Sequence, residues 1–125
     1  MFRTVTNLGA MLFAILAAAF FVVPNVVTAA WGLLLEGDAA FMGQRLAASF
    51  AGFAVMLFLV RDEPPSPARR AVAFGVATAM FLVAIVGALG MVQGIAGGGI
   101  LLAILVEVVF GTALILTGRF THPER

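Results

Sequence analysis

The sequence predicts an all-α membrane protein, an antiparallel bundle of four transmembrane helices that forms a single domain over residues 1–125. Of the 125 residues, 63% are hydrophobic and 10% are charged, whereas soluble globular domains have roughly 45–50% and 25%. Apolar stretches occur at residues 8–30, 39–60, 71–92 and 99–118. Each has about the 20 residues that a helix needs to cross hydrocarbon. Little chain remains for a soluble domain, so we expect the function to lie within or at the edge of the bilayer.

The first stretch should end close to Val23, because Pro24 lacks an amide donor and clashes with the preceding helical turn. The next segment, residues 25–35, suggests a short interfacial helix with Trp31 at the depth of the lipid headgroups. An alternative stays open for residues 1–30, in which Arg3, an apolar core and small residues at 27–30 form a signal peptide. The apolar core is long for a signal peptide, which favours a retained helix.

The later stretches are separated by clear breaks. Asp38 suits the amino-terminal cap of the second helix, since its carboxylate can accept backbone amides. Residues 61–67 include Pro64, Pro65 and Pro67, which exclude a helix there. The connection at residues 93–99 is rich in glycine and uncharged, as expected of a tight turn on the translocated side. It lacks the Lys-Ser/Thr pair and the preceding strand of a phosphate-binding loop.

The arginines are unevenly placed, and the chain has no lysine. If the amino terminus is cytoplasmic, only Arg45 lies toward the other side. The arginines on the cytoplasmic side are then Arg3, Arg61, Arg69, Arg70, Arg119 and Arg125. Cytoplasmic loops are enriched in arginine and lysine. The sequence therefore predicts a multi-pass protein of the bacterial inner membrane with both termini in the cytoplasm, and Arg69 and Arg70 are expected to anchor the third helix against anionic lipid.

Two ionisable residues fall inside predicted spans, Arg45 in the second and Glu107 in the fourth. An unpaired charge at the bilayer centre costs about 2.5–3.5 kcal/mol or more. Small neighbours lie on both helical faces, and the helical rise places both residues about 9–12 Å from the outer end. We therefore predict that Glu107 points into the bundle and forms an ion pair with Arg45. Further polar partners of this pair would be Asp38, Gln44, Ser49 and Gln93.

Two other interpretations of these residues remain open at the level of sequence. Arg45 could extend to the outer headgroups, and Glu107 could be a protonated acid bonded to a backbone carbonyl. The same residues could also be functional, as a carboxylate that releases a proton or a guanidinium that holds an anionic headgroup or a quinone carbonyl. A structural pair and a functional pair have the same sequence pattern.

No complete catalytic, metal or nucleotide site is present in the sequence. There is no cysteine, and His122 is the sole histidine, so thiol chemistry, a bis-histidine haem and a histidine-rich metal site are excluded within one chain. We therefore expect no enzymatic activity, no cofactor and no nucleic-acid partner. The favoured function is a structural or accessory subunit of a membrane complex, in contact with lipids and with a protein partner or further copies of itself. The alternative is a small transporter or a protein that binds a lipid or quinone through Arg45 and Glu107.

One set of features resembles a known group of proteins. It comprises a first span that ends at Pro24, the pair Trp31-Gly32, and Gly43-Gln44-Arg45 followed by Gly52. This order is similar to that of small four-helix bacterial membrane proteins of the DoxX-like neighbourhood, many of them uncharacterised. The resemblance implies a four-helix membrane fold, marks Arg45 as the position of greatest interest, and points to accessory subunits near quinone-linked oxidoreductases. The absence of redox residues argues against a redox role of this chain alone.

Overall fold

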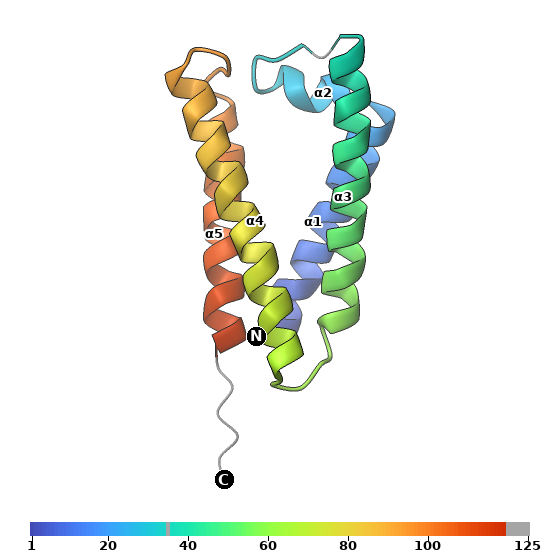
Figure 1. Ribbon diagram of the computed structural model, residues 1–125, viewed down its shortest axis with the longest axis vertical. Coiled ribbons are helices and arrows are strands. Elements are labelled where there is room, and N and C mark those ends of the chain that lie inside the picture. Colours follow the sequence, from blue (N-terminus) through green and yellow to red (C-terminus); the bar gives the residue numbers. More distant parts are fainter. Residues whose placement is uncertain (35, 120–125) are drawn as a thin grey trace.

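The computed structural model describes residues 1–34 and 36–119, all of whose regular elements are helices. Four of them are long and apolar enough to cross a membrane, and they run alternately up and down (Figure 1). These four are α1 (Phe2–Val22), α3 (Asp38–Val60), α4 (Pro67–Val92) and α5 (Ile100–Arg119). A short helix, α2 (Pro24–Ala29), lies between α1 and α3. The predicted all-α bundle with a short extra helix after the first span is confirmed.

The boundaries of the first two helices differ from the prediction. Helix α1 begins at Phe2 rather than residue 8, because Thr6 satisfies its hydroxyl by donating to the carbonyls of Phe2 and Arg3, both at 3.1 Å. It ends at Val22, as Pro24 requires, and α2 then continues only to Ala29. The chain turns beyond α2, so the predicted helix over residues 25–35 is too long, and residue 35 itself lies outside the described part of the chain.

The four long helices form two tightly packed antiparallel pairs. Helix α1 packs mainly on α3, and α4 mainly on α5. Fewer contacts join the pairs, between α1 and α5 and between α3 and α4. Among the described residues, the backbones of the diagonal helices α3 and α5 do not come close to each other, and only side chains approach between them. Figure 1 shows the pairs diverging toward the end that carries α2.

Aromatic rings form the core where the two pairs meet. Phe13 is fully buried, and its ring lies 5.7 Å from Phe50, 5.3 Å from Phe53 and 6.3 Å from Phe110. Glycine next to these rings allows close approach, since a Cβ on Gly9 would overlap the Phe110 ring and lie 2.9 Å from Leu57 Cδ1. Small residues at helix contacts are typical of membrane bundles, where packing replaces the hydrophobic effect as the force between helices.

The two ends of the bundle differ in charge. One end, which we call the arginine end, holds the start of α1, the α3–α4 loop and the last turn of α5 (Figure 1). The other end, the loop end, holds α2 and residues 93–99. The arginine end gathers the described arginines apart from Arg45, namely Arg3, Arg61, Arg69, Arg70 and Arg119. Arg125 lies outside the described residues.

Arg69 links three helices at the arginine end. Its Nη1 donates to the Glu63 carbonyl at 3.3 Å, and its Nη2 donates to the Thr117 carbonyl in α5 at 3.2 Å. Its guanidinium carbon also lies 3.8 Å from the centroid of the Phe2 ring in α1, a cation–π geometry. Arg70 is exposed, as lipid anchoring requires. Arg69 thus connects helices, a role that its sequence context did not indicate.

Candidate functional site: a cavity at the loop end

The predicted ion pair between Arg45 and Glu107 does not form. Arg45 is exposed on α3, whereas Glu107 is half-buried on α5, a helix whose backbone does not approach that of α3 in the described chain. Within residues 1–34 and 36–119, the ion pairs are instead Arg3 with Asp62 at 3.1 Å and Arg61 with Asp62 at 3.0 Å, both at the arginine end. The prediction of this pair is therefore wrong.

The physical reason for the error is the rotation of α3 about its own axis. The side of α3 that packs includes Gly43, Ala47 and Phe50, all buried. Arg45 lies two residues from both Gly43 and Ala47, which at about 100° per residue turns it to the opposite side. The small residues near Arg45, including Gly52, are exposed and line no helix contact. Small side chains thus occur on both sides of α3, and only one side packs.

The predicted supporting residues are dispersed. Asp38 is exposed in the first turn of α3, where Gly37 rather than Asp38 occupies the cap position. Gln44 Nε2 donates to the Phe21 carbonyl at 3.5 Å, and Ser49 is exposed on α3. Gln93 alone among them lies in the same cavity as Glu107.

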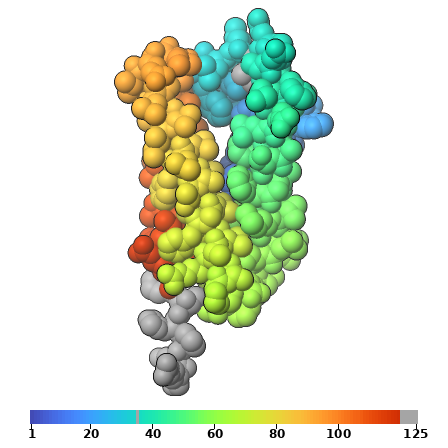
Figure 2. Space-filling model, in the orientation of Figure 1, coloured from blue at the N-terminus to red at the C-terminus, as the bar shows by residue number. Residues whose placement is uncertain are grey.

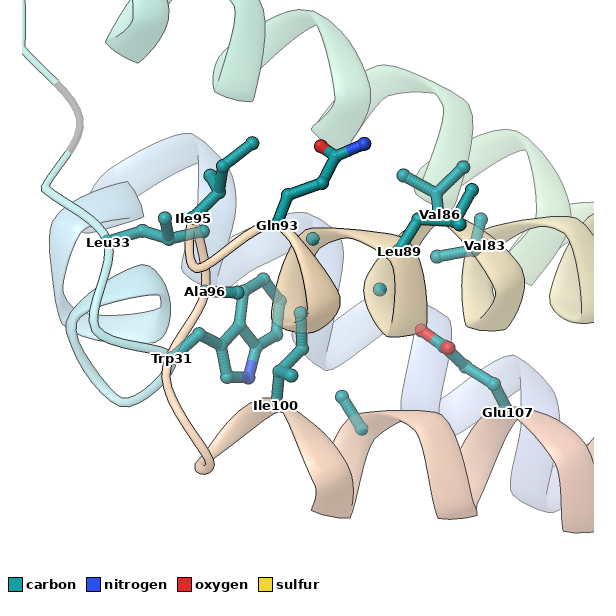
Figure 3. Close-up of a pocket in the computed structure, with 13 residues that line it drawn as sticks. Trp31, Leu33, Val83, Val86, Leu89, Gln93, Ile95, Ala96, Ile100 and Glu107 are labelled. Carbon is teal, nitrogen blue, oxygen red and sulfur yellow. The ribbon is translucent and has the colours of Figure 1, made fainter.

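This cavity has a volume of about 460 Å³ and lies between α4, α5 and the segment that follows α2 (Figure 3). Pockets for small ligands usually measure about 300–1,000 Å³. The surface is also hollowed between α3 and α4 toward the loop end, on the face shown in Figure 2. The cavity is lined by Trp31, Leu33, Val83, Val86, Gly87, Leu89, Gly90, Gln93, Ile95, Ala96, Ile100, Ala103 and Glu107.

Helical periodicity explains this lining. Ile100, Ala103 and Glu107 recur at intervals of three and four residues, so they share one face of α5. On α4, Val83, Gly87 and Gly90 form the facing stripe by the same rule. Gly87 lets α5 approach closely, since a Cβ there would lie 3.1 Å from Ile104 Cγ1.

Glu107 is the one ionisable residue in the lining. By the helical rise it lies about 10 Å along α5 from Ile100, well inside the membrane-spanning segment. Its carboxylate turns from α5 toward α4 (Figure 3). Within the described chain it has no hydrogen bond and no ion pair to any residue. Glu107 is therefore half-buried and faces the cavity rather than Arg45.

Trp31 forms the wall of the cavity nearest the loops. Its carbonyl accepts a hydrogen bond from the Gly97 amide at 2.7 Å, and its ring lies 5.9 Å from the ring of Phe20. The backbone of Gly99 packs so closely on Ala30 that a Cβ at residue 99 would overlap the Ala30 carbonyl oxygen. The segment after α2 and the α4–α5 loop are therefore held backbone to backbone. Sequence alone placed Trp31 at the headgroups and gave no sign of this contact beyond the abundance of glycine in residues 93–99.

The described residues contain no group of three or more His, Cys, Asp or Glu side chains that could hold a metal ion. His122 lies outside the described part of the chain. The cavity therefore presents apolar walls, one carboxylate and the amide of Gln93. Such a site can hold and orient a molecule, but no nucleophile or base–orienter pair accompanies the carboxylate.

Comparison of the chain with protein families, with curated proteins and with solved structures finds no match. The resemblance to DoxX-like membrane proteins stays a prediction from sequence.

Proposed function

We propose that this membrane protein binds a small lipophilic molecule in the cavity at the loop end. The observation that carries the proposal is an apolar cavity of about 460 Å³ with a single carboxylate, that of Glu107, inside a membrane-spanning helix. Binding sites for small molecules combine mostly apolar walls with a few polar groups that fix orientation. Intramembrane ionisable residues commonly mark such sites.

Two features favour this function over a purely structural bundle. A cavity forfeits the dispersion contacts that would otherwise hold α4 and α5 to the rest of the protein. An acidic side chain without a partner in an apolar setting adds a further cost. Neither the cavity nor the unpartnered acid benefits a bundle selected only for packing. A ligand that fills the cavity and contacts Glu107 offsets both of these costs.

Replacing Gly90 with leucine is expected to abolish binding, because the new side chain would project into the cavity. A Cβ at Gly90 meets only the Ala96 Cβ, at 3.7 Å, so the backbone at this position accepts a side chain. Trp31 is the sole tryptophan and the chain has no tyrosine, so its fluorescence reports on the cavity directly. The probes are three compounds with one 4-bromophenylbutyl body and an amine, alcohol or carboxylic acid headgroup, added to protein in phosphatidylcholine vesicles. The unchanged protein should show saturable quenching by at least one probe, and Gly90→Leu should show only the linear quenching of probe dissolved in lipid.

Gly75→Leu is the matched control, since Gly75 lies on the same helix, is exposed and has no atom within 4 Å of its Cβ position. This variant should keep the saturable component. Equal quenching curves for the unchanged protein and Gly90→Leu, with all three probes, would contradict binding in the cavity.

A second candidate function, an accessory or structural subunit of a membrane complex, is favoured by the exposed side of α3. Arg45, Ala48 and Gly52 share this side, and Arg45 has no partner among the described residues. An arginine at this depth gains from an acidic partner, and small residues permit close helix contact. Gly52→Leu should then release a protein that co-purifies in mild detergent, as measured by mass spectrometry. Purification of the unchanged protein without any protein partner would count against this candidate.

For orientation, we propose that the protein lies in a bacterial inner membrane with the arginine end in the cytoplasm. The concentration of Arg3, Arg61, Arg69, Arg70 and Arg119 at that end supports this through the positive-inside rule. The cavity then opens in the outer half of the bilayer. A reporter protein that is active only in the cytoplasm should be active when inserted at Pro64, and one that is active only in the periplasm should be inactive there. Activity of the periplasmic reporter at Pro64 would contradict the proposed orientation.

A further inference from the structure

We infer that the cavity takes a compact lipophilic amine, whose ammonium group contacts Glu107 and whose apolar body lies toward Trp31. This inference rests on the proposed function and adds the charge of the ligand to it. It comes from the position of the single carboxylate relative to the apolar walls.

Charge complementarity selects the headgroup. Glu107 is the one ionisable side chain among the lining residues, and the polar side chain of Gln93 is neutral. Beside the ionised carboxylate, an anionic headgroup would place a second negative charge in the same apolar space, where charges interact strongly. A neutral headgroup can offer the carboxylate one hydrogen bond but no opposite charge. An ammonium group offers both a charge-assisted hydrogen bond and the counter-ion that the described chain does not supply.

The shape of the cavity selects the rest of the ligand. Glu107 and Trp31 lie at opposite ends of the lining in Figure 3, with Ile100 between them. From Ile100 to Glu107 the wall formed by α5 extends about 10 Å by the helical rise. The walls along this length are aliphatic or aromatic. A ligand with a ring or a short chain attached to the ammonium group matches the length of this wall and the volume of the cavity.

The vesicle assay with the three bromophenylbutyl probes also tests the headgroup. In the unchanged protein, the amine should reach half-maximal saturable quenching at a concentration at least tenfold below that of the alcohol, and the acid should show none. In Glu107→Gln, which keeps the shape of the side chain and removes its charge, the amine and the alcohol should differ by less than threefold. Gly75→Leu should keep the full preference for the amine.

The outcomes separate this inference from the proposed function. The unchanged protein could show saturable quenching that Gly90→Leu removes, yet no preference for the amine. This result would overturn the ammonium assignment and leave a neutral lipophilic ligand. A preference that survives in Glu107→Gln would overturn the role of Glu107. Loss of saturable quenching with every probe would overturn the proposed function itself. Because the amine and the alcohol are compared in the unchanged protein, the assignment stays testable even if Glu107→Gln fails to fold.

Discussion

Replacing Gly9 with leucine is expected to lower the free energy of unfolding by about 3 kcal/mol, at the upper end of the usual range for overpacked cores. Gly9 lies in α1 where the Phe110 ring of α5 and Leu57 of α3 converge. Even a Cβ would overlap the ring, so the larger side chain must displace the Phe110 ring from its place against α1. The contact between α1 and α5 is one of those that join the two helix pairs in the described part of the chain. The substitution should therefore loosen the whole junction between the pairs.

Unfolding in mixed micelles with a rising fraction of sodium dodecyl sulfate, followed by circular dichroism, measures this effect. Gly75→Leu is again the control, because its Cβ position is open, and it should change the free energy of unfolding by less than about 0.5 kcal/mol, as exposed sites do. If the two variants unfold at the same detergent fraction, Phe110 does not pack on Gly9.

Replacing Gly99 with alanine is expected to have the second-largest effect, a loss of about 2–3 kcal/mol from overpacking and the strain on a hydrogen bond. The added methyl would overlap the Ala30 carbonyl oxygen, which belongs to the backbone and cannot rotate away. The α4–α5 loop must then move off the segment after α2. This movement stretches the bond of 2.7 Å from the Gly97 amide to the Trp31 carbonyl and shifts one wall of the cavity.

Gly98→Ala provides a neighbouring control, because no atom lies within 4 Å of its Cβ position and its backbone is not left-handed. In the same micelle titration, Gly99→Ala should unfold earlier than Gly98→Ala. The Trp31 emission should also move to longer wavelength in Gly99→Ala alone as the indole gains contact with water. Matching emission spectra in the two variants would show that Gly99 does not hold the loops together.

The spans and their order were predictable because they depend on length and composition. Pro24 correctly ended the first helix, and the prolines around residue 65 marked the loop between the pairs. The start of α1 was misplaced because Thr6 looks polar in sequence but satisfies itself on the helix backbone. Uneven arginine placement likewise predicted which helix ends lie together, and the described arginines other than Arg45 do gather at one end.

The site was less predictable, because depth along a helix can be counted but rotation about its axis cannot. Arg45 and Glu107 reach similar depths, yet α3 and α5 lie diagonally across the bundle, and their described backbones do not come close. Small residues on both sides of α3 left its packing side ambiguous, and burial of Phe50 decided it. The role of Trp31 depends on a contact between two loops far apart in sequence, which no local pattern encodes.

Packing is tighter within each helix pair than between the two pairs, and this difference bears on how the protein is made. Each pair consists of helices consecutive in the chain apart from the short α2, so each can assemble as a hairpin while it leaves the translocon. The α3–α4 loop is the only covalent link between these hairpins. We therefore expect their docking in the lipid to be the last step of biogenesis, and the cavity to come into existence only at that step.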